Sequence, residues 1–292
     1  MTILVTGAGG HLGRLVVDAL LARGAAPADV VATSRDTAKL EDLAARGVRV
    51  AELDYDRPDT IAAALDGVDA VLLVSGSIPG VRLAGHRNVI EAAQAAGVGK
   101  LVYTSIVHAT TAEDFPLADD HRATEALIAE SGVPSVILRN GWYSENQLSD
   151  VAHAAESGVI AAAVGDGRVA SAARADFAEA AAVVLLEDGH LGAIHELAGD
   201  HAWSYDELAA AASEVLGREV RYERLSVAER VAALRAAGLD EGIAAFVAGL
   251  DDGVRRGILA DTDGTLARLI GRATTPLVDV LRAGLATQAA AV

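Results

Sequence analysis

The sequence contains no cysteine. This absence excludes disulfide bonds, thiol nucleophiles and cysteine-bound metal. Aromatic residues make up only 3% of the 292 residues although 52% are apolar, so the core must depend on small aliphatic side chains, many of them alanine. No apolar run is long enough for a membrane-spanning helix, and we therefore expect no membrane span.

Basic residues are also scarce. The chain has 24 Lys and Arg against 41 Asp and Glu, which gives a formal net charge of −17. Because Lys and Arg form no cluster and nucleic-acid phosphates require basic patches, we expect no nucleic-acid partner. Met1 leads directly into a strand pattern, which leaves no room for a signal peptide, and we expect a cytoplasmic protein.

The start of the chain carries the strongest motif. Residues 1–6 (MTILVT) are typical of a strand, GAGGHLG follows as a turn, and LVVDALLARG has helical spacing. In this context a glycine turn predicts a phosphate site at a helix N-terminus. We expect Gly7 to make the turn, Gly10 to admit a pyrophosphate and Gly13 to permit close helix–strand contact. The GxxGxxG spacing is a variant of GxGxxG, and a plain turn is the competing interpretation.

The end of the second expected strand, residues 30–34, indicates which dinucleotide binds. NAD-binding proteins normally hold Asp or Glu there, whereas this chain reads Ser34-Arg35. A guanidinium can bind a 2′-phosphate through charge-assisted hydrogen bonds. We therefore predict a preference for NADPH over NADH, and the alternative is that Arg35 is an ordinary solvated arginine.

Strand and helix patterns alternate in the first half of the chain. Strands are expected at 1–6, 30–34, 48–53, 70–74, 100–105 and 135–139, and helices at 37–45, 58–65, 82–96 and 120–131. This alternation predicts an α/β fold with a Rossmann-type doubly wound parallel sheet. After Gly141 short strands, such as 193–197, stand among long helices, and from Tyr205 onward the pattern is mostly helical with one strand at 220–225. We predict an NAD(P)-binding domain at 1–140, to which 165–190 could return, and a smaller substrate-side α/β domain at 141–292, with a ligand cleft between them.

Two segments offer candidate chemistry. Ser105 ends the fifth strand, but the Tyr-x-x-x-Lys pair of short-chain dehydrogenases is absent, and HRATE stands in the next helix. His121 and Glu125 share a helix face there, and His121 has a side chain able to donate a proton near neutral pH. A purely structural pair is an equally good interpretation, and two ligands on one helix do not make a metal site.

The second segment, LRNGWYSEN, follows the sixth strand. Asn140 could bond the nicotinamide amide, while Trp142 and Tyr143 could form an apolar wall for a flat substrate. The competing interpretation is a domain-joining turn with packing aromatics.

Several motifs together carry a family resemblance: VTGAGGHLG, the pair Asp54-Tyr55, GHRNVIEAAQAAGV, YTSIVHA, LADDHRATE, LRNGWYSEN, GDGRVASAARAD, HELAGDHAW and LIGRATTPL. The chain resembles the NmrA-like atypical short-chain dehydrogenases, and within them the bacterial type-2 NAD(P)H:quinone oxidoreductases. Triphenylmethane dye reductases are similar but lack GWYSEN. The resemblance implies an NADPH site made by Gly7, Gly10, His11, Leu12, Arg35, Asp54, Tyr55, Ser75, Gly76, Ser105 and Asn140.

We therefore predict an NADPH-dependent reductase that transfers hydride to quinones or similar flat electrophiles. The candidate catalytic residues are His121, Tyr143 and Ser105, and the candidate substrate-binding residues are Trp142, Tyr143 and Asn146. Two alternatives remain: an NADP(H)-binding redox sensor without turnover, and a reductase of triphenylmethane dyes, imines or enones. A homodimer is left open.

Overall fold

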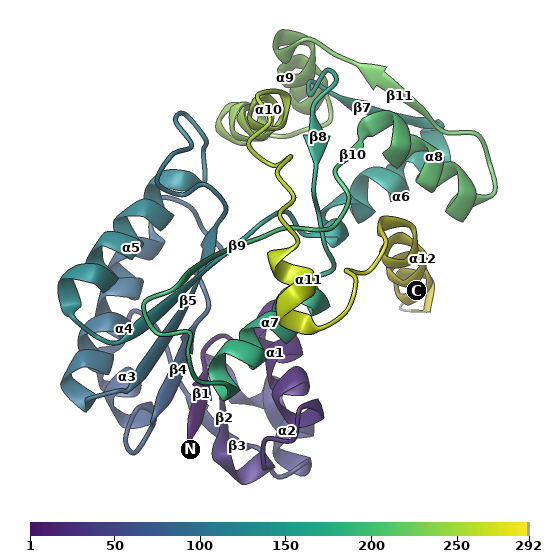
Figure 1. Cartoon of the computed structure of the whole chain (residues 1–292). Helices are drawn as coiled ribbons and strands as arrows, with labels where there is room; N and C mark the ends of the chain where they lie inside the picture. Colours follow the sequence, from purple (N-terminus) through teal and green to yellow (C-terminus); the bar gives the residue numbers. More distant parts are fainter. Residues whose placement is uncertain (291–292) are drawn as a thin grey trace. The chain divides into compact units, whose positions relative to one another are not determined.

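The computed structural model describes residues 1–290 (Figure 1). The chain divides into two compact units. The first unit contains residues 1–110, 117–140 and 174–197, and the second contains 111–116, 141–173 and the residues from 198 onward. The expected domain limits, including the return of 165–190, remain a prediction; the segment 174–197 belongs to the first unit.

A parallel sheet of seven strands forms the first unit, in the order β3-β2-β1-β4-β5-β6-β9. The strands are β1 Ile3–Val5, β2 Val30–Ser34, β3 Arg49–Glu52, β4 Ala70–Leu73, β5 Lys100–Ile106, β6 Ser135–Asn140 and β9 Ile194–Leu197. All neighbouring pairs run parallel, which confirms the predicted Rossmann-type sheet. The strand order reverses between β1 and β4, the position where doubly wound sheets bind their ligands.

Helices connect these strands (Figure 1). They are α1 His11–Ala22, α2 Glu41–Ala45, α3 Pro58–Ala64, α4 Arg82–Ala96, α5 Ala118–Ser131 and α7 Arg174–Leu186, with 3₁₀ turns at Pro27–Asp29 and Thr37–Leu40. The single helix expected at 37–45 is therefore a 3₁₀ turn followed by α2. Asp36 initiates the 3₁₀ turn, because its side chain accepts a hydrogen bond from the Ala38 N–H.

The core of the first unit lies on both faces of the sheet. Every residue of β1, β4 and β5 is buried, as expected for parallel strands covered by helices on both sides. The alanine-rich helix α7 buries nine of its 13 residues and packs along α1 and against the sheet. Lys100 holds the end of α7, because its Nζ donates to the carbonyls of Val184, Leu185 and Glu187 at 2.8–3.2 Å.

The second unit is mostly helical, as predicted. Its helices are α6 Leu148–Ser157, α8 Tyr205–Leu216, α9 Val227–Ala236, α10 Glu241–Arg255, α11 Thr265–Ile270 and α12 Leu277–Ala290, with a 3₁₀ turn at Ser144–Gln147. Two short sheets pair β7 Val159–Ala162 with β11 Arg221–Arg224, and β8 Arg168–Val169 with β10 Trp203–Ser204. Of the helices within residues 1–290, none combines the length and the apolar character needed to cross a membrane.

Candidate dinucleotide-binding site

The glycine turn after β1 has the geometry that its sequence predicts. Gly7 adopts a left-handed conformation with φ of 62° and its carbonyl accepts a hydrogen bond from Gly10 N at 2.9 Å. A Cβ on Gly13 would lie 2.5 Å from Gly7 O, so only glycine allows α1 to pack this closely on the turn. The turn therefore places the first residues of α1 directly beyond the carboxyl end of β1.

The N-terminus of α1 retains the properties of an anion site. Its N-cap is Gly10, no side chain caps the helix, and its first turn contains no acidic residue. The first backbone N–H groups of a helix lack intrahelical acceptors and carry a partial positive charge. They are therefore available to a phosphate.

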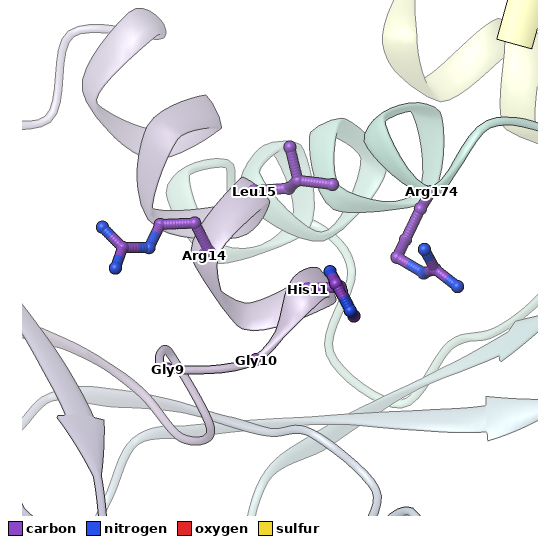
Figure 2. A pocket seen from close by; sticks show the side chains of 6 residues that line it. All are labelled: Gly9, Gly10, His11, Arg14, Leu15 and Arg174. Atoms are coloured by element: carbon purple, nitrogen blue, oxygen red, sulfur yellow. The ribbon is translucent and has the colours of Figure 1, made fainter. Parts of the chain in front are cut away.

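A pocket of about 400 Å³ opens at this helix end (Figure 2). Its lining consists of Gly9, Gly10, His11, Arg14, Leu15 and Arg174. The Arg14 guanidinium is already engaged, because it pairs with Asp42 at 2.5 Å and donates to the carbonyl of Lys39. The lining holds no carboxylate, so its charged groups favour an anionic ligand.

The end of β2 touches the glycine turn and carries the residue predicted to select the coenzyme. A Cβ on Gly9 would lie 2.6 Å from Ser34 Oγ, which shows how closely the two segments approach. Arg35 is exposed, and within residues 1–290 it forms no ion pair. The neighbouring carboxylate of Asp36 accepts from Ala38 N at 3.2 Å and so caps its own 3₁₀ turn. Arg35 is therefore able to bind an added phosphate.

Tyr55 and Asp54 follow β3. The Tyr55 hydroxyl donates to Val74 O at 2.7 Å and lies 2.6 Å from Thr6 Oγ1, and burial raises its pKa. The carboxylate of Asp54 accepts from Asp56 N at 3.1 Å. Tyr55 thus joins the ends of β1 and β4, which is a positioning contribution that the sequence did not reveal.

Ser75 and Gly76 lie in the loop after β4 and are held by side chains from other elements. Ser75 N donates to Thr104 Oγ1, and Gly76 N donates to His86 Nε2, both at 2.9 Å. Burial and the Arg82 charge lower the pKa of His86 to about 4, which keeps its imidazole neutral and able to accept. These contacts fix the start of the loop at the strand-order reversal.

His121 is buried inside a polar network rather than exposed on its helix. Its Nδ1 lies 2.8 Å from the Tyr103 hydroxyl and its Nε2 lies 3.2 Å from Arg82 Nη1. Since a guanidinium only donates, we assign the His121 proton to Nδ1. Burial and the Arg82 charge lower its pKa to about 3. Its role as a proton donor remains a prediction, and the neutral, buried ring argues against it.

Ser105 is likewise engaged. Its hydroxyl donates to Glu125 Oε1 at 2.5 Å, and Arg139 donates to both oxygens of the same carboxylate at 3.0 and 2.6 Å. Arg139 also donates to Glu196 at 2.8 Å, and Glu196 accepts from His108 N at 3.1 Å. The network ties β5, α5, β6 and β9 together, and the catalytic role expected for Ser105 stays untested.

The residues expected near nicotinamide and substrate lie in both units. Asn140 is buried, with 4% of its surface exposed, at the end of β6 in the first unit. Trp142 and Tyr143 are half-buried in the second unit, where Tyr143 forms a β-bridge with Ala172. Asn146 is exposed. Their binding roles remain predictions.

The parallel sheet, the uncapped helix end at its glycine turn and the cations around that turn together define a dinucleotide-binding protein of the Rossmann class. Within residues 1–290 no three His, Asp or Glu side chains gather closely enough to hold a metal ion. A family model described as NAD(P)H-binding matches residues 7–188. The chain belongs to this NmrA-like NAD(P)H-binding family, as its motifs predicted.

Individual proteins of known activity are similar to this chain over nearly its full length. The chain is 46% identical to quinone oxidoreductase 2 of Escherichia coli over 277 residues, which cover 95% of this chain and 96% of that protein. The crystal structure of the E. coli NADPH-dependent quinone oxidoreductase in complex with NADPH matches with a TM-score of 0.91, covering 96% and 98% of the two chains. The triphenylmethane reductase of Citrobacter sp. matches with a TM-score of 0.91 at 34% identity, covering 98% of this chain and 100% of that one.

Proposed function

We propose that this protein is an NADPH-dependent reductase whose substrates are quinones. The observation that carries the proposal is the uncapped, cation-lined pocket at the glycine turn, with Arg35 at the neighbouring strand end. It occurs in a chain with near full-length similarity to a quinone oxidoreductase. The bound nicotinamide coenzyme would supply the hydride, and the protein supplies binding, orientation and exclusion of water.

Different residues of the first unit would bind different parts of the coenzyme. In the proposal, Gly7, Gly10, His11 and Leu12 bind the pyrophosphate through the turn and the start of α1, and Arg35 binds the 2′-phosphate. The Asp54-Tyr55 segment lies by the adenosine part. The remaining part of the coenzyme would lie along Ser75, Gly76, Ser105 and Asn140. Several of these positions act by fixing the backbone, since Tyr55 and Ser105 are themselves hydrogen-bonded inside the unit.

The proposed reaction needs little acid–base help from the chain. A quinone that accepts a hydride also takes up one proton, which water can provide at the resulting oxygen. His121 has a pKa of about 3, so its ring holds no readily transferred extra proton at neutral pH. Trp142 and Tyr143 would supply an apolar wall and Asn146 an amide, and Tyr143 and Ser105 stay candidate catalytic residues.

An assay of NADPH oxidation with a series of benzoquinones tests the proposal. We expect turnover well above the rate without enzyme, and a Trp142→Ala variant should raise KM for the quinone while leaving NADPH binding unchanged. Oxidation of NADPH with triphenylmethane dyes or enones in the same assay would identify a reductase of broader substrate range. Tight NADP(H) binding without oxidation by any acceptor would instead support the redox-sensor alternative.

We also propose a cytoplasmic location. For the oligomeric state, both a monomer and a homodimer stay open. Fractionation of cells that express a tagged chain tests the first. Sedimentation velocity over a range of protein concentrations tests the second, since a specific dimer dissociates in a concentration-dependent manner.

A further inference from the structure

One wall of the pocket at the glycine turn comes from a distant part of the chain. Arg174 is the first residue of α7 and the first residue of the segment that returns to the first unit. Figure 2 shows its side chain beside that of His11, at the start of α1, and both residues line the pocket. A residue 163 positions after His11 thus completes the site.

The position of Arg174 is fixed by a well-packed helix. Nine of the 13 residues of α7 are buried, and the helix packs along α1. Glu179 of α7 also pairs with Arg23, just beyond the end of α1, at 2.8 Å. The backbone that carries Arg174 is thus held in place, so binding need not order it, as it would for an arginine on a loose loop.

The charges around this wall favour a diphosphate. Both α1 and α7 begin at the pocket, and each helix start carries a partial positive charge. Asp176, the acidic residue in the first turn of α7, is fully buried and is not part of the lining. Arg14, on the other side of the pocket, pairs with Asp42, and Arg174 lines the pocket beside His11.

We propose that Arg174 binds the pyrophosphate of the coenzyme, opposite the backbone N–H groups of α1. This inference rests on the proposed function. A guanidinium presents two parallel donors to phosphate oxygens, a geometry that a lysine ammonium cannot reproduce. Arg174 and Arg35 therefore bind different groups. Arg174 contributes to the binding of every dinucleotide, because each has a pyrophosphate, whereas Arg35 contributes only when a 2′-phosphate is present.

Calorimetric titration of an Arg174→Gln variant with NADPH, NADH and ADP-ribose tests the inference. We expect all three affinities to fall by a similar factor, on the order of 10-fold or more, because each ligand loses the same charge-assisted contact. Binding of adenosine, which has no phosphate, should be unchanged. Arg174→Lys should recover only part of the affinity, because it restores the charge without the paired donors.

Arg23→Gln is the matched control. It removes the Arg23–Glu179 pair between α1 and α7 at a distance from the pocket, and it should leave the dinucleotide affinities unchanged. Unchanged NADH and ADP-ribose affinities in Arg174→Gln would overturn the inference, as would a loss confined to NADPH. If Arg174→Gln unfolds, the Lys variant provides the same comparison. Failure of the unsubstituted protein to bind any dinucleotide would contradict the proposed function itself.

Discussion

Arg35, exposed just beyond the end of β2, is the residue that we propose selects the coenzyme. In Arg35→Ala we expect KM for NADPH to rise by about 10- to 100-fold, since a hydrogen bond to a charged group contributes about 1.5–3 kcal/mol. KM for NADH should change little, because NADH has no phosphate at this position. Steady-state rates with a single quinone and both coenzymes give the comparison. Arg49→Ala, which removes an exposed arginine on β3, is the control, and equal shifts for both coenzymes would exclude the assigned role.

Two buried histidines make the stability of the first unit sensitive to acid. Burial and the Arg82 charge lower the pKa of His86 to about 4 and that of His121 to about 3. Both folded-state values lie below the unfolded value of about 6.5, so the unfolded chain binds more protons in between. The two histidines therefore make their full contribution to the free energy of unfolding above pH 6.5, and this contribution is lost as the pH falls toward 4 and then 3.

We expect the free energy of unfolding to fall by up to about 4 kcal/mol between pH 7 and pH 5, about 2 kcal/mol for each histidine. Urea titrations at a series of pH values measure this slope. His121→Gln should reduce the slope, whereas His153→Gln, which changes an exposed histidine, should not. A slope that is the same in all three proteins would assign the acid sensitivity to other groups.

At the scale of elements, the close contact between α1 and the glycine turn limits which residues position 13 tolerates. In Gly13→Ala the new Cβ would meet Gly7 O at 2.5 Å and Ala8 N at 2.9 Å, and backbone cannot yield as a side chain can. We expect a loss of about 1–3 kcal/mol in stability and weaker NADPH binding. Thermal melts with and without NADPH measure both effects. Gly99→Ala is the control, because its Cβ would lie at an ordinary 3.5 Å from Asp69 O.

The junction of β5, α5 and β6 depends on a buried ion pair. The side chains of Arg139 and Glu125 are 10% and 8% exposed and lie 2.6 Å apart. Arg139→Met would leave the Glu125 carboxylate buried without its cation, at a cost of about 3–5 kcal/mol. Adding Glu125→Gln to that variant should restore part of the stability, and a double-mutant cycle by urea unfolding measures this coupling. Strictly additive losses would show that the two side chains act independently.

Much of this arrangement is encoded locally. The strands of the large sheet were predicted to within a few residues, because strands buried on both faces read as continuous apolar runs. The strands β7, β8 and β10 were not predicted; β8 and β10 have only two residues each, too few for a periodic pattern. In the site, the glycine turn and Arg35 follow from neighbouring residues. Arg174 and Arg139 do not, because their partners lie far along the chain and are set by tertiary packing.

At the scale of the whole molecule, the order of the chain makes the first unit discontinuous. Residues 1–140 supply six strands of the sheet, but α7 and β9 come from 174–197. The helix α7, whose buried residues include Phe177 and Leu185, packs on α1 and on the strands β4 and β5. A fragment that ends at residue 140 would therefore expose that apolar surface to water.

We predict that the fragment 1–140 does not unfold cooperatively and shows no thermal shift with NADPH. A shortened chain can restore the missing segment, because Ala172 N donates to Trp142 O at 3.1 Å and a few glycine and serine residues can join the two. The chain 1–142, linker, 172–197 should regain a cooperative melt and an NADPH-dependent shift, since it again contains α7 and Arg174. The same chain with Arg174→Gln should melt cooperatively with a smaller shift. Full folding and binding by 1–140 alone would show that the returning segment is dispensable.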